Sequence, residues 1–261
     1  MKQLLLPALL LGLLYPTAPV FASASGAATI DWDSFSVQLI DLSGGLNTPV
    51  FTWTSQYGEV YSYAYTPTST SYGGYYQASD FSSPLLSVSD TSAAQVTASR
   101  DADALHAYAA TQPGTNPWGS GYNNYAYGYS YNYGAFSLSG NGVAVITMDW
   151  DVSLTGSMGN WNDYSYAYAG IWGSYSDSLY SSGSANSSFS TYSTYNGDAL
   201  VSGSFAMAVV GTGNATATGY LYAQAYAHAY SPSEPVPEPE SYALILAGLA
   251  LVGWMARRRE S

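Results

Sequence analysis

Residues 135–155 read AFSLSGNGVAVITMDWDVSLT, two stretches of alternating apolar and polar residues separated by Gly140-Asn141-Gly142. Alternation with a period of two places successive side chains on opposite faces of a strand, so each stretch is predicted to be a half-buried β-strand. Asn-Gly between two such stretches is typical of a tight turn. We therefore interpret residues 135–155 as a β-hairpin.

Similar stretches recur along most of the chain. They cover residues 28–42, 50–66, 85–98, 102–110, 164–171, 200–210 and 215–230. Gly58 is a candidate break within the second stretch, which reads as one long strand or two short ones. Residues 111–124 and 181–190 are predicted to be surface loops. We expect an all-β fold, an antiparallel sandwich or jelly roll of roughly eight to ten strands, and a solenoid is disfavoured because no fixed period repeats.

Charge is scarce and almost entirely negative. The 261 residues include 5 Lys and Arg and 17 Asp and Glu, for a formal net charge of −12. Arg100 is the only cation between residues 23 and 234, which hold fourteen carboxylates. Such a surface repels phosphate backbones and excludes nucleic-acid binding. The chain has no cysteine, which excludes disulfides, thiolate metal sites and cysteine nucleophiles.

The N-terminus carries an export signal. Met1-Lys2-Gln3 precedes an apolar run at residues 4–14, and small residues lie around position 22. This order is typical of a signal peptide, here residues 1–22, and it makes the secretion translocon and signal peptidase partners of the chain. A membrane anchor is disfavoured because the apolar run is too short.

The C-terminus places three features in order. They are Pro237, Glu238 and Pro239, the apolar residues 242–256, and the cluster of Arg257, Arg258 and Arg259. A helix over residues 242–256 rises about 22 Å, which is short for a hydrocarbon core of about 30 Å. The arginines act as a stop-transfer cluster that holds the tail in the cytoplasm. A permanent single-pass anchor is the alternative interpretation.

This order resembles the PEP-CTERM sorting signal of Gram-negative bacteria, over residues 236–261, with Pro237, Glu238 and Pro239 as its motif. The tail is also classed as an ice-binding protein C-terminal domain, which describes the tail and implies no ice binding. The resemblance implies a transient inner-membrane anchor, recognition by exosortase, a sorting protease, and release to the cell surface or extracellular matrix. It also implies a bacterium that makes exopolysaccharide or biofilm. Residues 23–230 are then the ectodomain and residues 231–235 a Pro- and Ser-rich linker.

Tyrosine supplies the most unusual pattern. The chain has 27 tyrosines, and Tyr125, Tyr127, Tyr129, Tyr131 and Tyr133 occupy every second position. In a strand all five rings project from one face, with small residues on the other. An exposed face of this kind suits stacking on sugar rings and hydrogen bonding to their hydroxyl groups, whereas a buried one fills a core. The five are candidate sugar-binding residues, and the pattern fits both alternatives.

Signals for catalysis are weak. The pairs Asp31/Asp33, Asp101/Asp103 and Asp149/Asp151 suit glycoside hydrolysis or a weak structural Ca²⁺ site, but solvated or locally hydrogen-bonded aspartates near strand ends are the preferred interpretation. His106 and His228 have no metal-site spacing, and the sequence contains no nucleophile elbow, P-loop or dinucleotide fingerprint. We expect no enzyme activity and no cofactor.

Three functions fit these patterns, in order of preference. The first is a non-enzymatic, exosortase-sorted matrix protein that contacts exopolysaccharide through tyrosines. The second is a self-associating structural biofilm protein, because Tyr-, Gly- and Ser-rich strands with little charge favour edge pairing. The third is a secreted carbohydrate-active enzyme that uses an aspartate pair.

Overall fold

The computed structural model describes residues 24–112, 115–116, 123–156, 164–179, 181–193, 199–232 and 234–235. Every regular element within these ranges is a strand, as the alternating sequence predicts. No helix in this part of the chain has the length and hydropathy that a membrane crossing needs. The predicted signal peptide, the sorting motif and the apolar segment at 242–256 lie outside the described residues.

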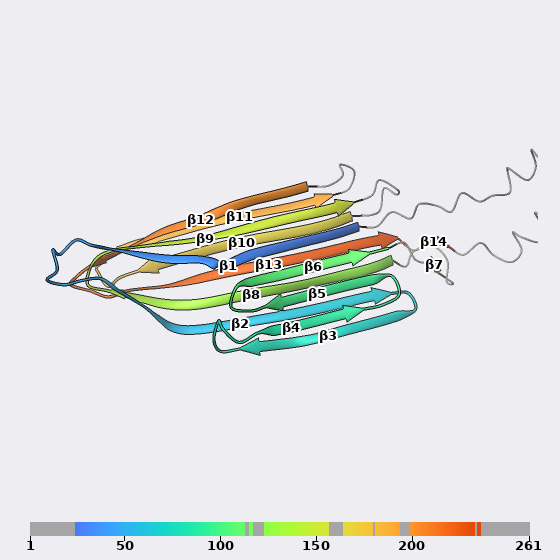
Figure 1. Ribbon diagram of the computed structural model, residues 1–261, viewed down its shortest axis with the longest axis horizontal. Coiled ribbons are helices and arrows are strands. Elements are labelled where there is room, and N and C mark those ends of the chain that lie inside the picture. Colours follow the sequence, from blue (N-terminus) through green and yellow to red (C-terminus); the bar gives the residue numbers. More distant parts are fainter. Residues whose placement is uncertain are drawn as a thin grey trace, which may run out of the picture.

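Two antiparallel six-stranded sheets form a β-sandwich (Figure 1). Sheet A has the order β12 (Ala199–Thr212), β9 (Asn141–Gly156), β1 (Ala24–Asp41), β6 (Ala104–Thr111), β5 (Ala94–Arg100) and β4 (Leu85–Asp90). Sheet B has the order β11 (Ser182–Ser193), β10 (Tyr164–Ser176), β13 (Ala217–Pro232), β8 (Asn123–Ser139), β2 (Val50–Thr66) and β3 (Ser69–Ala78). A short parallel pair joins β7 (Thr115–Asn116) to β14 (Glu234–Pro235).

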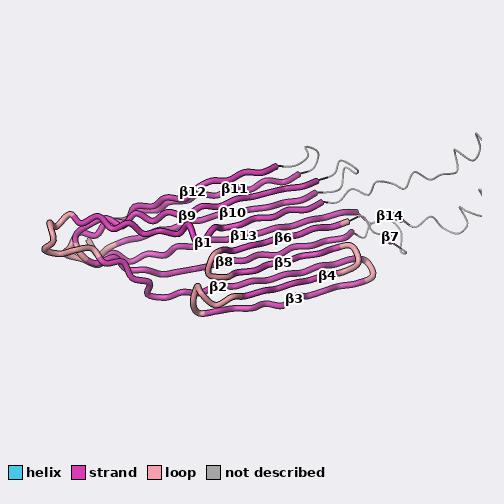
Figure 2. The backbone as a smooth tube through the Cα atoms, viewed as in Figure 1, coloured by secondary structure: helices cyan, strands magenta, loops and turns pink. Residues whose placement is uncertain are grey.

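The strands run along the long axis of the molecule, and the turns from β3 to β4 and from β5 to β6 lie partway along it (Figure 2). Ala24, at the start of β1, pairs with Thr111 at the end of β6. The Thr111 hydroxyl lies 2.9 Å from the hydroxyl of Ser231 near the end of β13. The described chain therefore enters and leaves the sandwich at the same end.

The hairpin predicted at residues 135–155 is wrong. β8 ends in sheet B and β9 begins in sheet A, so the turn at Gly140 carries the chain from one sheet to the other. Gly140 has a φ of 85°, and a Cβ there would lie 2.2 Å from the carbonyl oxygen of Thr48. The N–H of Asn141 donates to the carbonyl of Asn47 at 2.8 Å, which anchors the crossover on the loop before β2. The residues on both sides of Gly140 alternate between apolar and polar whether the turn forms a hairpin or a crossover between sheets. The sequence pattern therefore did not distinguish a hairpin from a crossover.

Some other predicted strand limits also need correction. Residues 50–66 form one long strand, which confirms the first of the two alternatives; it continues through Gly58, and its register shifts between Trp53 and Ser55 and between Ser62 and Tyr63. Residues 181–190 were predicted to be a loop but lie largely in β11, because an edge strand of small polar residues shows no apolar alternation. Residues 85–98 contain two strands, and β3 was not predicted, so the sheets have more strands than expected. Much of the predicted loop at 111–124 lies outside the described residues.

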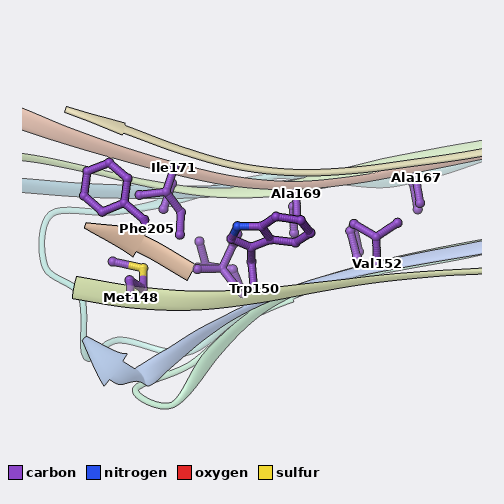
Figure 3. Close-up of a cluster of buried hydrophobic side chains, with 14 of the residues drawn as sticks. Met148, Trp150, Val152, Ala167, Ala169, Ile171 and Phe205 are labelled. Atoms are coloured by element: carbon purple, nitrogen blue, oxygen red, sulfur yellow. The ribbon is translucent and has the colours of Figure 1, made fainter. Parts of the chain in front are cut away.

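The two sheets contribute core side chains of different size. Sheet B mostly turns small residues inward, including Ala64, Ala126, Ala167, Ala169, Ala223, Ala225, Ala227 and Ala229. Sheet A supplies larger ones, including Ile30, Val96, Leu105, Val152 and Leu154. Figure 3 shows Trp150 and Val152 facing Ala167 and Ala169 across the interface. Large residues against small ones fill the space between the sheets at the density of a close-packed core.

Arg100, the only cation in the described part of the chain, is buried in this core with 1% of its surface exposed. Its guanidinium donates to the carbonyl oxygens of Asp80 and Ser83 at 2.7 and 2.6 Å and to the side-chain oxygen of Asn132 at 3.1 Å. Burial lowers the pKa of Arg100, and the nearby Asp80 carboxylate acts in the opposite direction. The residue therefore anchors the connection between β3 and β4 through neutral acceptors.

Arg100→Met tests this anchor. Methionine fills much of the same space but leaves the three oxygen acceptors without a donor. We expect the free energy of unfolding, measured by urea denaturation, to fall by about 3 kcal/mol. Ser99→Ala on the same strand is the control and should change stability little. Equal stabilities of Arg100→Met and the wild type would contradict the assigned anchor.

Candidate binding site: an outward face of tyrosines

The tyrosines of β8 lie on the outer face of sheet B. Tyr125, Tyr127, Tyr129, Tyr131 and Tyr133 are partly exposed, and the intervening residues 126, 128, 130 and 132 are buried against sheet A. The small intervening residues face the core because the larger side chains of sheet A already fill the space between the sheets. The five rings extend over about 26 Å at about 3.3 Å per residue.

Neighbouring strands extend this surface sideways, because their aromatic residues share its register. Four aromatic rows cross the sheet: Tyr164-Tyr230-Tyr125-Tyr65, Tyr166-His228-Tyr127-Tyr63-Tyr72, Tyr168-Tyr226-Tyr129-Tyr61-Tyr75 and Trp172-Tyr222-Tyr133-Tyr57. Between the last two rows lies a polar row, Gly170-Gln224-Tyr131-Glu59-Gln77. We call these five rows the tyrosine face.

The rings of the tyrosine face pack on one another across the strands. Tyr61 stacks on Tyr129 with 5.6 Å between ring centroids, and Tyr131 stacks on Tyr222 at 5.1 Å. Trp172 and Tyr222 are closer, at 3.9 Å. Cross-strand aromatic pairs stabilise a sheet, so the face is a continuous aromatic layer that is partly buried by its own members.

Glu59 is a buried carboxylate at the centre of the polar row, with 4% of its surface exposed. Four phenols donate hydrogen bonds to it: Tyr57 at 2.7 Å, Tyr129 at 2.6 Å, Tyr131 at 2.9 Å, and Tyr75. Burial alone raises the pKa of Glu59, but these hydrogen bonds outweigh it and hold the pKa below the ordinary value. Glu59 is therefore an anion stabilised by neutral donors, and it fixes the orientation of rings on three strands.

Burial changes the pKa of several ionisable groups of the face. Burial raises the pKa of both Tyr222 and Tyr226 to about 12. Burial, together with the Glu59 carboxylate, also raises the pKa of Tyr129 and Tyr131. Burial lowers the pKa of His228 to about 4, so this ring is neutral as well. The surface thus offers uncharged rings and hydroxyl groups, with Glu59 as its internal anion.

Two shallow depressions lie on the side of the tyrosine face that is formed by β10, β11 and β13. One, of about 500 Å³, is lined by Tyr168, Trp172, Ser174, Ser184, Asn186 and Tyr220 among others. The second, of about 440 Å³, is lined by Tyr166, Tyr168, Gln224 and Tyr226. Tyr168 separates them, and we call the pair the Tyr168 groove.

The sequence analysis did not find Glu59, Trp172 or Gln224 as candidate residues. Their roles depend on partners from other strands, such as Tyr75 on β3 for Glu59 and Tyr222 on β13 for Trp172. The available signal was local: Glu59 is the single carboxylate between residues 42 and 79 and immediately precedes the tyrosine-rich end of β2.

The predicted histidine and aspartate candidates are dispersed. His106 lies on the exposed face of sheet A, 3.3 Å from the Thr29 hydroxyl, whereas His228 lies in sheet B. Asp101 accepts the N–H groups of Asp103 and Ala104 and caps its own turn.

The other two aspartate pairs meet at one place in sheet A. Asp31 is the register partner of Asp149, and Asp151 pairs with Thr29. Asp31 also accepts the backbone N–H of Ser34 at 3.3 Å, close to the irregularity that follows it in β1. No group of three or more acidic or histidine side chains within the described ranges is arranged to hold a metal ion.

Comparisons with known proteins identify the C-terminal tail. Residues 235–259 match the family described as the PEP-CTERM protein-sorting motif. This agrees with the resemblance of Pro237–Pro239 and Arg257–Arg259 to that signal, and the motif implies an exported protein that exosortase sorts.

The other comparisons carry less information about this chain. A comparison with curated proteins finds none for the chain. Among solved structures, the vicilin of hazelnut (Corylus avellana) aligns over 75% of this chain and 84% of its own, with 8% identity and a TM-score of 0.10, which is too low to carry an argument.

Glu59→Gln tests the central carboxylate. Glutamine keeps the shape but removes the charge and one acceptor, so the phenols lose part of their hydrogen bonding. We expect the free energy of unfolding at neutral pH to fall by about 2 kcal/mol in urea denaturation. The pKa of Glu59 is lowered in the folded state, so its contribution is complete above its ordinary pKa of 4.5 and is lost as pH falls through the lowered value.

The difference between Glu59→Gln and the wild type should therefore shrink in acid. Asp90→Asn, at an exposed position of β4, is the control and should have a small effect at every pH. A pH-independent difference would show that the charge of Glu59 plays no part.

Proposed function

We propose that the protein is a non-enzymatic component of an extracellular polysaccharide matrix, to which its tyrosine face binds. The observation that carries this proposal is the outward orientation of the rings. Tyr125 to Tyr133 and their neighbours on β2, β10 and β13 face away from the core, although tyrosines at a two-residue spacing equally suit an interior.

The chemistry of the tyrosine face supports a carbohydrate ligand. A sugar presents apolar C–H faces and a rim of hydroxyl groups, which match aromatic planes and neutral hydrogen-bonding groups. The raised pKa values of Tyr222 and Tyr226, about 12 in both cases, keep these phenols available as donors. Export under a sorting signal, with exosortase as partner, supports delivery to the cell surface or the extracellular matrix.

Tyr63→Ala with Tyr127→Ala tests the binding face. These tyrosines are register partners with ring centroids 5.7 Å apart and donate no hydrogen bond to Glu59. In cosedimentation of the purified exported protein with the exopolysaccharide of its own bacterium, we expect the double variant to bind about tenfold more weakly.

Tyr108→Ala is the matched control, because Tyr108 is 39% exposed on the opposite sheet. Its binding should equal that of the wild type, with and without Ca²⁺. Equal loss in both variants, or saturable binding by neither the wild type nor the variants, would refute sugar binding by the tyrosine face.

Self-association is a second candidate function, and the edge strand β12 favours it. β12 is the last strand of sheet A and its residues ALVSGSFAMAVVGT include no charge and no proline. Leu200 and Val210 on this strand are 77% and 37% exposed. Natural sheets usually protect such edges with charged residues or proline, so an unprotected edge suits pairing with a second copy.

Val210→Lys tests edge pairing. If β12 pairs between molecules, sedimentation velocity of the wild type should show a mass that rises with protein concentration, and the lysine variant should remain monomeric. Ser182→Lys, at an exposed position of β11 on the edge of the other sheet, is the control for added charge alone. A wild type that is monomeric at all concentrations would exclude this function.

A further inference from the structure

Tyr168 divides the groove into its two depressions. Gly170 lies between Tyr168 and Trp172 on β10, and a Cβ there would lie 2.0 Å from the Tyr168 hydroxyl. The phenol of Tyr168 therefore lies over Gly170, and it lines both depressions. The register partner of Gly170 on β13 is Gln224, a polar residue rather than an aromatic one.

Aromatic and amide groups line this groove together. Trp172 packs against Tyr222 with ring planes inclined by 33°. Asn186 on β11 is the register partner of Trp172, and Gln224 lies in the adjoining row. Within the described residues, no hydrogen bond engages the side-chain amide of Asn186 or of Gln224. Each amide offers two donors and one acceptor, which suits the vicinal hydroxyl groups of a sugar.

The charges of the described residues indicate which class of carbohydrate the groove can bind. Arg100 is their only Lys or Arg and is buried in the core with 1% exposure, so no such side chain in the described ranges meets a ligand on the tyrosine face. Glu59 is the nearby anion, and its carboxylate already accepts hydrogen bonds from four phenols. A uronate, sulfate or phosphate group on the ligand would find no cationic partner and would be repelled by a chain with a net charge of −12.

We propose that the Tyr168 groove binds an uncharged polysaccharide, with one sugar ring stacked at Trp172 beside Asn186 and the adjoining part of the same polymer, across Tyr168, held by Gln224. This inference rests on the proposed function and names the ligand class and the subsite within the tyrosine face. Trp172 supplies the apolar platform, and the two amides bind hydroxyl groups on either side of Tyr168. Chains built of uronic acids are excluded as ligands.

The test measures binding of the purified exported protein to three soluble polymers by affinity electrophoresis. Dextran and a cellulose oligomer are the neutral probes and alginate is the uronate probe. The wild type should be retarded by at least one neutral probe and not by alginate. Its dissociation constant for the neutral probe should be the same at low and high salt, because no ion pair is formed.

Variants then locate the subsite. Trp172→Ala should weaken binding to the neutral probe about tenfold, and Trp172→Phe should restore part of it. Gln224→Ala should weaken binding several-fold without removing any ring, and it serves if Trp172→Ala fails to fold. Tyr108→Ala on the opposite sheet should bind as the wild type does.

The outcomes separate this inference from the proposed function. If Tyr63→Ala with Tyr127→Ala abolishes binding but the Trp172 and Gln224 variants do not change it, the groove is wrong and the tyrosine face stands. If alginate binds as tightly as the neutral probes, the ligand class is wrong. If neither these polymers nor the exopolysaccharide of the bacterium binds, both proposals fail together.

Discussion

The two-residue period of sheet B is the constraint on which the rest of the structure depends. Over the tyrosine-rich parts of β2, β8, β10 and β13, small residues face sheet A and large aromatic ones face away from it, and the two sets cannot exchange. A one-residue slip would drive the phenols of β8 into a space already occupied by Val96, Ala98 and their neighbours. The larger side chains of sheet A thus complete the core, and the aromatic side chains of sheet B lie on the outer face of that sheet.

Among the described residues, both buried charges are held by hydrogen bonds to uncharged groups. Arg100 is held by the carbonyls of Asp80 and Ser83 and by Asn132, and Glu59 by four phenols. An isolated buried ion is costly unless hydrogen bonds replace its hydration. Uncharged hydrogen-bonding groups stabilise both ions. Because phenols rather than a cation surround Glu59, the tyrosine face has no cation. The same feature that stabilises Glu59 thereby restricts the ligands that the surface can accept.

Most of the strands could be predicted from the sequence, and their connections could not. Alternation correctly indicated β1, β2, β6, β10, β12 and β13, because burial on one face imposes a local period of two. It failed for β11, where an edge position and small polar residues remove the apolar signal. It also misread the Gly140 turn, because a hairpin and a crossover between sheets place the same residues on the buried side.

The sequence by itself determined that the chain carries a PEP-CTERM sorting motif, that its body is all-β, and that Tyr125 to Tyr133 share one face of a strand. These properties are local, since a sorting motif and a strand period are both read within a few residues. Only the tertiary structure decided that this face points outward, which residues extend it sideways, and that Glu59 and Trp172 belong to it. Those properties depend on the register between strands far apart in the chain, which the packing of both sheets sets together.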